Sequence, residues 1–415
     1  MRRPAVAILG AGPIGLEAAA AAVEAGFETT IYEMSDDVAG NVRSWGHVQL
    51  FTPWSMNVSP RVRRLLSEMG QEPPDGDDCP TGHQLAERVF DPLAALPSIA
   101  SRLRLGTEVL EVGRDGLLKS DEIGTGERSR RPFRILIRER TGERVERADV
   151  VLDCTGTYHH PNALGRGGIR APGEGSADAR IIRRIPDFDA SELEGAGASA
   201  LAGKRILLVG GGHSAQTAAC DLQRLVEVAP GTRVTWAVRN PAPSFGAVDD
   251  DPLPARAELV AKALELTSTG SPFDVRLGRE VERLAPTADG IDVVLASEVD
   301  ASGAGAAETV TVDWIVSLTG SVGDARLYRQ LQVHECYATS GPMKLAAALL
   351  GAGAGDCLAQ ESHGAETLKN PEPDFYILGS KSYGRNNTFL LRVGWEQVDE
   401  VFSLIEPQTL AAQAS

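Results

Sequence analysis

The chain has 415 residues, enough for two or three domains, and its 42% hydrophobic and 24% charged residues exclude wholesale disorder. Its 41 Lys and Arg residues against 57 Asp and Glu residues give a net charge of −16, which nucleic acids and anionic lipid headgroups would repel. We therefore expect neither nucleic acid nor a membrane surface as a partner.

The five cysteines include no Cys-x-x-Cys pair, so the sequence predicts neither a disulfide scaffold nor a cysteine-rich zinc site. The seven histidines lack the spacings typical of metal sites, and we expect no metal. The sequence contains no run of 18 apolar residues, so we expect no transmembrane helix. Glycines interrupt the apolar stretch at the N-terminus, which argues against a signal peptide. These observations predict a cytoplasmic protein.

The first predicted unit is a strand, a turn, a helix and a second strand. Residues 5–9 form a short apolar run, residues 10–15 match G-x-G-x-x-G, and the alanine-rich residues 16–25 predict a helix. A strand over residues 29–32 follows. In such a unit the glycines let the backbone approach a pyrophosphate at the helix N-terminus, and an acid after the second strand binds ribose hydroxyls. The sequence predicts a dinucleotide site at Gly10, Gly12, Pro13, Ile14, Gly15 and Glu33.

Two later strands each run into a Thr-Gly pair. Residues 131–147 alternate as in a half-exposed antiparallel hairpin, and residues 150–154 and 314–318 are apolar strands. We interpret the junctions that follow these two strands as crossovers between domains. They consist of Thr155 and Gly156 in the first case and of Thr319 and Gly320 in the second.

The second predicted unit repeats the design about two hundred residues later. A strand over residues 205–209, a glycine turn, a helix over residues 214–228 and a strand over residues 233–238 follow one another. Arg239 then stands where the first unit has an acid, and a guanidinium can bind a 2′-phosphate, which favours NADPH. Arg239 and His213 each have an alternative interpretation. Arg239 is then a solvated loop residue, and His213 is then only a neighbour of the helix cap. The predicted site contains Gly210, Gly212, His213, Ser214, Ala215 and Arg239.

The predicted fold class is therefore α/β, with two Rossmann-like dinucleotide-binding domains and the NAD(P)H domain inserted into the FAD domain. The predicted boundaries are 1–162 for the first part of the FAD domain, 163–318 for the NAD(P)H domain and 319–415 for the second FAD part. The last part contains a strand over residues 375–378 and a helix from about Trp395 to Leu404. Two such sites suggest FAD bound permanently at the first and NADPH bound transiently at the second, with hydride passing to the flavin.

The order of these motifs resembles the flavin-containing monooxygenase group, the class B flavoprotein monooxygenases. The resemblance rests on the first glycine loop, Gly40 to Trp45, residues 153–158, the second loop and the C-terminal helix. It implies that NADPH reduces FAD, that O₂ forms a C4a-peroxyflavin, and that one oxygen atom passes to N, S or a carbonyl of a small soluble substrate. The group's Phe-x-Gly-x-x-x-His pattern is absent, and residues 169–174 stand in its place.

The resemblance also implies roles for individual residues. Trp54, Asn57 and Asn386 are the catalytic candidates, with Asn57 hydrogen-bonding to an oxygen adduct of the flavin. The competing interpretations are a turn residue for Asn57 and a plain surface turn for the loop that contains Asn386. The further residues expected to bind cofactor are Gly40, Asn41, Trp45, Gly379, Leu390 and Gly394.

Two other functions remain open at this point. One is an NAD(P)H-dependent flavoprotein reductase that passes electrons to a disulfide, a quinone or a protein, for which Cys336 and Cys357 could form a redox pair. The other is a non-catalytic FAD-binding regulator, which would leave the second nucleotide site without a purpose. A homodimer is compatible with the sequence but nothing in it requires one.

Overall fold

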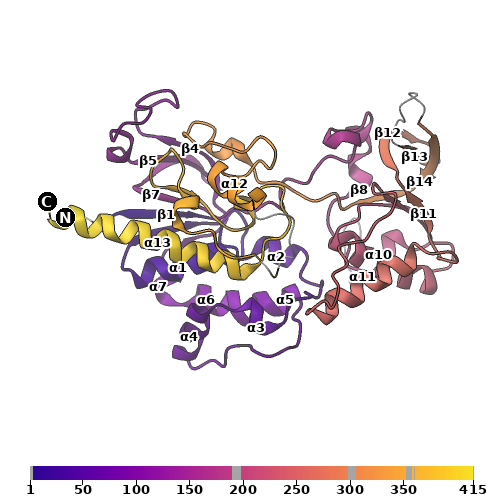
Figure 1. Cartoon of the computed structure of the whole chain (residues 1–415), viewed down its shortest axis with the longest axis horizontal. Coiled ribbons are helices and arrows are strands. Elements are labelled where there is room, and N and C mark those ends of the chain that lie inside the picture. The colour runs from indigo at the N-terminus through magenta and orange to yellow at the C-terminus, as the bar shows by residue number, and fades with distance from the viewer. Residues whose placement is uncertain (1–2, 189–197, 298–304, 352–357, 359, 415) are drawn as a thin grey trace. The chain divides into compact units, whose positions relative to one another are not determined.

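The computed structural model describes residues 3–188, 198–297, 305–351, 358 and 360–414 (Figure 1). The chain divides into two compact units. The first contains Met1–His160 together with Val322–Ser415, and the second contains Pro161–Ser321. Each has a five-stranded parallel sheet of its own.

The first unit is built around the sheet β16-β7-β1-β2-β3, in which every strand runs parallel to its neighbours. Its strands are β1 (Ala5–Leu9), β2 (Glu28–Tyr32), β3 (Leu103–Arg104), β7 (Val150–Asp153) and β16 (Phe375–Ile377). An antiparallel sheet contains β4 (Glu108–Arg114), β5 (Phe133–Glu139) and β6 (Gly142–Ala148). The helices are α1 (Pro13–Glu24), α2 (Gly40–Ser44), α3 (Trp54–Asn57), α4 (Pro60–Glu68), α5 (Gly82–Leu85), α6 (Asp91–Ala95), α7 (Pro97–Ala100), α12 (Met343–Gly351) and α13 (Leu391–Ala414). A π-helical turn, η1 (Ala86–Phe90), follows α5, and the 3-10 helices are η2 (Arg128–Arg130), η5 (Ala325–Tyr328), η7 (Ala365–Leu368) and η8 (Gly379–Tyr383).

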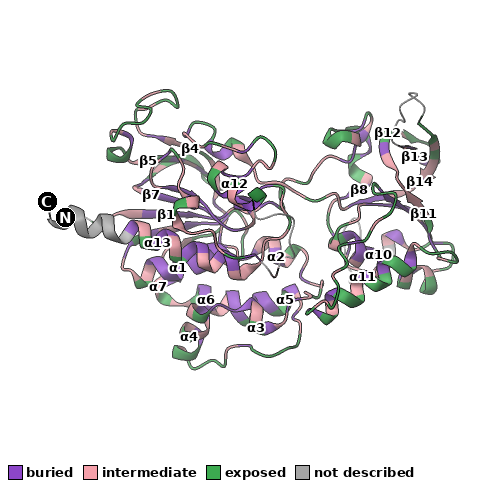
Figure 2. Cartoon of the chain, viewed as in Figure 1, coloured by how far each residue is buried: buried purple, intermediate pink, exposed green. Residues whose placement is uncertain are grey.

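Both faces of this sheet are buried, as the continuous apolar run of β1 requires. Val6 and Ile8 point into a core shared with α1 and α13, whereas Ala7 and Leu9 point into a core shared with the β4–β6 sheet. Figure 1 shows α1 and α13 on one face of the sheet and β4 and β5 on the other. Helix α1 begins at Pro13, which is favourable in a first turn, and its alanines are buried almost throughout (Figure 2).

The second unit repeats this architecture with the sheet β11-β10-β9-β15-β8. Its strands are β8 (Ile181–Ile182), β9 (Arg205–Val209), β10 (Arg233–Val238), β11 (Asp274–Leu277) and β15 (Trp314–Ser317), and an antiparallel sheet contains β12 (Glu280–Thr287), β13 (Gly290–Ala296) and β14 (Ala307–Val312). The helices are α8 (Glu174–Ala177), α9 (Ala198–Leu201), α10 (His213–Val228) and α11 (Pro254–Leu266), with short turns η3 (Arg166–Gly168) and η4 (Asp178–Arg180). Leu207 and Val209 of β9 pack against the β12–β14 sheet.

An aspartate fixes the start of the central strand in both units. In the first unit the backbone N–H of Ala5 donates to Asp149 Oδ2 at 2.8 Å, and in the second the N–H of Arg205 donates to Asp313 Oδ2 at 2.8 Å. Each aspartate directly precedes the next strand of its sheet, β7 or β15. The guanidinium of Arg205 adds an ion pair of 2.7 Å to Asp313. The two units are thus alike in detail as well as in strand order.

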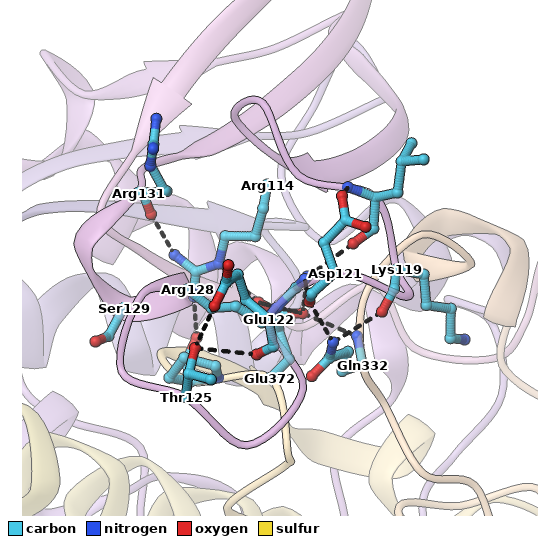
Figure 3. Close-up of polar contacts among 12 residues, drawn as sticks. Arg114, Lys119, Asp121, Glu122, Thr125, Arg128, Ser129, Arg131, Gln332 and Glu372 are labelled. Atoms are coloured by element: carbon cyan, nitrogen blue, oxygen red, sulfur yellow. Dashed lines mark hydrogen bonds and ion pairs between the residues drawn. The ribbon is translucent and has the colours of Figure 1, made fainter.

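A buried ion cluster fixes the long connection between β4 and β5 (Figure 3). Arg114 Nε donates to Glu372 Oε1 at 2.7 Å, and Arg128 Nη2 donates to Glu372 Oε2 at 2.6 Å, with all three side chains at most 1% exposed. Arg128 also donates to the carbonyl oxygens of Leu118 and Asp121, both at 3.0 Å. Because two guanidinium groups share one carboxylate, removing that carboxylate would leave two buried charges without their main partner.

The C-terminal helix is longer than the sequence predicts. It begins at Leu391, four residues before the expected start, and continues to Ala414. Gly394 lies inside its first turn, and glycine disfavours a helix interior, which is why the sequence places the start later. A Cβ atom at Gly394 would collide with the side chain of Ile14. The close packing of α13 on α1 therefore favours glycine there.

Candidate functional site

The first glycine loop connects β1 to α1 at the carboxyl edge of the sheet. Gly10 has φ of +96°, and a Cβ there would lie 2.8 Å from the carbonyl oxygen of Cys154. A Cβ on Gly15 would collide with the carbonyl oxygen of Gly10, whereas one on Gly12 would meet no heavy atom within 4 Å. The space in front of the α1 N-terminus is therefore open, and no side chain caps the helix. This cradle fits a pyrophosphate.

Glu33 is held beside this loop. Its side chain follows β2 and is 7% exposed. Oε2 accepts the backbone N–H of Ala11 at 2.7 Å, and Oε1 accepts the N–H of Ser35 at 2.9 Å. Gly40 begins α2 close by, and a Cβ on it would collide with the Ser35 hydroxyl. The carboxylate is fixed and keeps lone pairs for the hydroxyl groups of a ribose.

The second glycine loop has the same backbone geometry. Gly210 has φ of +132° and lies against the carbonyl oxygen of Leu318, while a Cβ on Gly212 would meet no heavy atom within 4 Å. The caps of the two helices agree closely, with φ of −76° at both Gly12 and Gly212. Ala215, at the third loop position, is fully buried. This loop, too, fits a pyrophosphate at a helix N-terminus.

The segment after β10 folds back over the second loop. Gln216 Nε2 donates to the carbonyl oxygens of Gly211, at 3.2 Å, and Phe245, at 3.0 Å. The Phe245 ring stacks on Trp236 with 5.3 Å between centroids. Gly246 lies close to the imidazole of His213, since a Cβ built on this glycine would be 3.7 Å from His213 Nε2. Sequence reasoning missed Gln216 because its signal is a single polar residue on the buried face of a helix.

Arg239 and Ser214 are both exposed, unlike Glu33 in the first unit. Arg239 directly follows β10 and is exposed. Ser214 lies in the first turn of α10 beside the open space at Gly212. The first unit has a buried carboxylate at the position of Arg239, so the two sites differ in both charge and exposure.

A buried lysine joins the first crossover to the C-terminal segment. Lys381 Nζ lies 2.6 Å from Asp153 Oδ2 and 3.0 Å from Thr155 Oγ1. Gly156 follows with φ of +70°. In the other crossover, Thr319 Oγ1 donates to the carbonyl of Asn162 at 3.1 Å, and Gly320 has φ of +83°. No local pattern predicts the Lys381–Asp153 pair, because 228 residues separate its members.

The C-terminal segment closes on the first glycine loop. The N–H of Gly379 donates to Gln397 Oε1 at 2.9 Å, and a Cβ on Gly379 would lie 3.2 Å from Ile14. A Cβ on Gly394 would collide with the same isoleucine. The carbonyl of Leu390, just before α13, accepts the N–H of Val393 at 3.1 Å. The structure therefore brings Ile14, Gly379 and Gly394 together.

Of the two predicted flavin-facing tryptophans, Trp45 is half-buried and Trp54 is buried. Trp45 directly follows α2, the helix that contains Asn41, and stacks on Tyr158 with 6.3 Å between ring centroids. Among the described residues, its buried indole Nε1 has no hydrogen-bond partner. Trp54 begins α3, is 5% exposed, and lies 5.0 Å from the guanidinium of Arg88.

Asn57 and Asn386 are both engaged within their own loops. Asn57 Nδ2 donates to the carbonyls of Thr52 and Pro53, each at 2.8 Å, and Oδ1 accepts the Thr52 hydroxyl at 3.1 Å. Asn57 is the last residue of α3, and these bonds join it to the segment that precedes the helix. Asn386 Oδ1 accepts both the N–H and the hydroxyl of Thr388, at 3.0 and 2.8 Å. Their contacts with a flavin or substrate stay predictions.

The four described cysteines are free. Cys154 lies against the first glycine loop, and burial raises the pKa of its thiol. Cys336 occupies a turn in which the hydroxyl and backbone N–H of Thr339 lower its pKa. Cys357 lies outside the described residues, so the predicted Cys336–Cys357 pair stays untested. Within the described ranges, no three His, Cys, Asp or Glu residues gather as metal ligands, and no helix could span a membrane.

Comparisons with known proteins agree with this geometry. Residues 8–68 match the family of NAD(P)-binding Rossmann-like domains. Over 98% of this chain and all of that chain, the structure is similar to bacillithiol disulfide reductase from Bacillus cereus, with a TM-score of 0.67 and 17% identity. The chain has the fold of two-domain flavoproteins.

Other similar structures carry different activities on this fold. The cadaverine monooxygenase of Erwinia amylovora, a structure bound to FAD, matches with a TM-score of 0.62 and 13% identity over 98% of this chain and 95% of that chain. The ornithine N-hydroxylase of Kutzneria sp. 744 matches with a TM-score of 0.60 and 14% identity over 98% and 99%. No curated protein sequence matches the chain. The fold alone does not separate oxygenation from disulfide reduction.

Proposed function

We propose that the chain is an NADPH-dependent, FAD-containing monooxygenase that acts on a small soluble substrate in the cytoplasm. The observation that carries this proposal is the pair of unlike cradles: one beside the buried Glu33, the other beside the exposed Arg239. The first suits a cofactor that stays bound, and the second suits one that exchanges and bears a 2′-phosphate. The proposed domains follow the same division, with FAD in the first unit and NADPH in the second.

The residues of the first unit fit FAD. The open space at Gly12 would receive the pyrophosphate, Glu33 would bind the ribose, and the N-terminus of α13 would face developing negative charge. Bound FAD would supply hydride acceptance from NADPH and reaction with O₂. In the overall reaction, one oxygen atom of O₂ is transferred to the substrate. The two electrons of NADPH and two protons reduce the other oxygen atom to water. The chain's own task is to bind, orient and exclude water.

Oxygen is favoured as the acceptor by the state of Cys154. A disulfide reductase needs a thiolate near its flavin, because the thiolate is the nucleophile in disulfide exchange. Cys154 is buried against the first loop, and burial raises its pKa, which keeps the thiol protonated at neutral pH. The aromatic side chains of Trp45 and Trp54 belong to the same unit and suit a pocket that excludes water.

The second candidate is an NAD(P)H-dependent reductase of a disulfide, quinone or protein acceptor. It is supported by Cys336, whose turn lowers the pKa of the thiol and contacts the loop after η8. The contact is a hydrogen bond of 2.7 Å from the N–H of Arg385 to the carbonyl of Thr339. This candidate predicts that Cys336→Ser abolishes turnover, while the oxygenase predicts near wild-type turnover.

Rapid mixing of NADPH-reduced protein with O₂ distinguishes the two candidates. For an oxygenase we expect an absorbing species, distinct from both reduced and oxidised flavin, that lives longer when NADP⁺ is present. The control is Cys336→Ser, which should give the same trace. Direct return to oxidised flavin at every NADP⁺ concentration, together with loss of turnover in Cys336→Ser, would support the reductase instead.

A further inference from the structure

A second arginine stands at the edge of the sheet where Arg239 is found. Strands β10 and β11 are parallel neighbours, with Val238 opposite Leu277. The residues that follow them, Arg239 and Gly278, therefore leave the sheet at the same edge. The N–H of Arg279 donates to the carbonyl of Val238 at 3.2 Å, so the turn after β11 crosses the end of β10.

The backbone on both sides of this edge is fixed. Gly278 has φ of +63°, and a Cβ on it would lie 3.3 Å from Pro241, two residues after Arg239. On the other side, Gln216 and Trp236 hold Phe245, as described above. The fixed backbone therefore keeps Arg239 and Arg279 at the same edge of the sheet.

Among the described residues, Arg279 has one long ion pair, and its guanidinium can therefore bind a further anion. Its Nε lies 3.4 Å from Glu308 Oε1, and its side chain is 25% exposed. Glu308 is shared with Arg276, which it binds at 2.9 Å and which also pairs with Asp274. The neighbouring carboxylate of Glu280 faces Arg166 at 3.4 Å. Arg276 therefore forms ion pairs with two carboxylates, whereas Arg279 forms one long ion pair with a carboxylate that also binds Arg276.

We propose that Arg279 is a second specificity-determining residue that binds the 2′-phosphate of NADPH together with Arg239. A phosphate carries close to two negative charges and several acceptor oxygens, so it can bind two guanidinium groups at once. Arg279 would exchange its long contact with Glu308 for a charge-assisted one. This inference rests on the proposed use of NADPH at the second site, and it adds a residue for which the sequence gives no motif.

The test measures binding of NADP⁺ and NAD⁺ by calorimetry to the FAD-loaded full chain, so that no turnover is needed. Arg279→Ala should weaken NADP⁺ roughly ten-fold and leave NAD⁺ within two-fold, because only NADP⁺ carries the extra phosphate. Arg276→Ala is the matched control, since it removes a guanidinium bound to the same Glu308. It should leave both affinities within two-fold.

The ratio of the NADP⁺ and NAD⁺ affinities distinguishes a specific effect from misfolding, because a misfolded site would bind both nucleotides more weakly. Equal weakening of NADP⁺ and NAD⁺ in Arg279→Ala would overturn the inference and assign Arg279 to the fold. An unchanged NADP⁺ affinity would overturn it as well. If the unaltered protein itself binds NAD⁺ and NADP⁺ equally, the NADPH preference of the proposed function fails, and the inference fails with it.

Discussion

The two glycine loops share one backbone path but have different surroundings. Both helices start at a glycine with φ of −76° and open space in front of it, at Gly12 and Gly212. Beside the first loop stands the buried carboxylate of Glu33, and near the second stands the exposed guanidinium of Arg239. The comparison teaches that the two turns offer the same opening for a diphosphate, while the residue after the second strand differs in charge and exposure. Under the proposed function, that residue selects the cofactor.

The largest effect is expected from filling one cradle at a time. Gly12→Val should cost the protein its yellow colour, because the new side chain occupies the space of the pyrophosphate, and losing such charge-assisted contacts costs about 3 kcal/mol or roughly a hundred-fold in affinity. Gly212→Val should keep the flavin and lose NADPH. Absorbance of the purified variants and calorimetry with NADP⁺ measure both outcomes. Full flavin occupancy in Gly12→Val would place FAD elsewhere.

The third position of the glycine loop is Gly15 in the first unit and Ala215 in the second, and we expect only the exchange of alanine for glycine to be tolerated. Gly15→Ala would force a Cβ against the carbonyl of Gly10, and we expect a loss of about 3 kcal/mol of unfolding free energy for such overpacking. Ala215→Gly removes a methyl group from a helix and should cost only about 1 kcal/mol. Denaturant unfolding of the full chain measures the two losses. Equal losses would contradict the difference between the loops.

Removing the exposed cation should change cofactor choice without changing the fold. Arg239→Ala should weaken NADPH roughly ten- to a hundred-fold, corresponding to about 1.5–3 kcal/mol for a charge-assisted contact, while NADH should hardly change. Initial rates of flavin reduction with each cofactor provide the measurement. Equal slowing with both would mean that Arg239 supports the loop and does not bind the phosphate.

The smallest effect concerns the aspartates that fix the two central strands. The side chain of Arg205 lowers the pKa of Asp313, so this carboxylate stabilises the fold above its unfolded pKa of about 4 and stops doing so as the pH falls through its lower folded pKa. Asp313→Asn should lose at most about 1 kcal/mol at pH 7, since the pair is partly exposed. In denaturant titrations the loss should shrink as the pH falls below about 4 and vanish only once the pH is below the folded pKa. A loss of equal size at every pH would point to packing.

The parts that the sequence predicts are those with local signals. The strands β1, β2, β9 and β10 and the helices α1 and α10 lie where short apolar runs, glycine turns and helix-favouring residues place them. Contacts between distant residues have no such signal. Glu372 lies 258 residues from Arg114, and only the folded chain shows that they form one buried cluster.

The same reasoning explains what was missed at the candidate site. Lys381 is a lysine in a polar loop, a pattern typical of solvent exposure, yet the fold buries it against Asp153. The role proposed for Arg279 has no local signal either, because this residue follows an edge strand and belongs to no nucleotide-binding pattern. Asn57, in contrast, is a candidate from the sequence. Its side chain donates to the carbonyls of Thr52 and Pro53, and its contact with a flavin stays a prediction.

Anaerobic titration of the purified protein with NADPH and, separately, with NADH tests the central claim most directly. The account predicts a yellow protein whose flavin absorbance is lost on addition of about one equivalent of NADPH, and much more slowly with NADH, because hydride passes from the second site to the first. A protein that purifies without flavin, or whose bound flavin neither nicotinamide cofactor reduces, would contradict the assignment of the two loops.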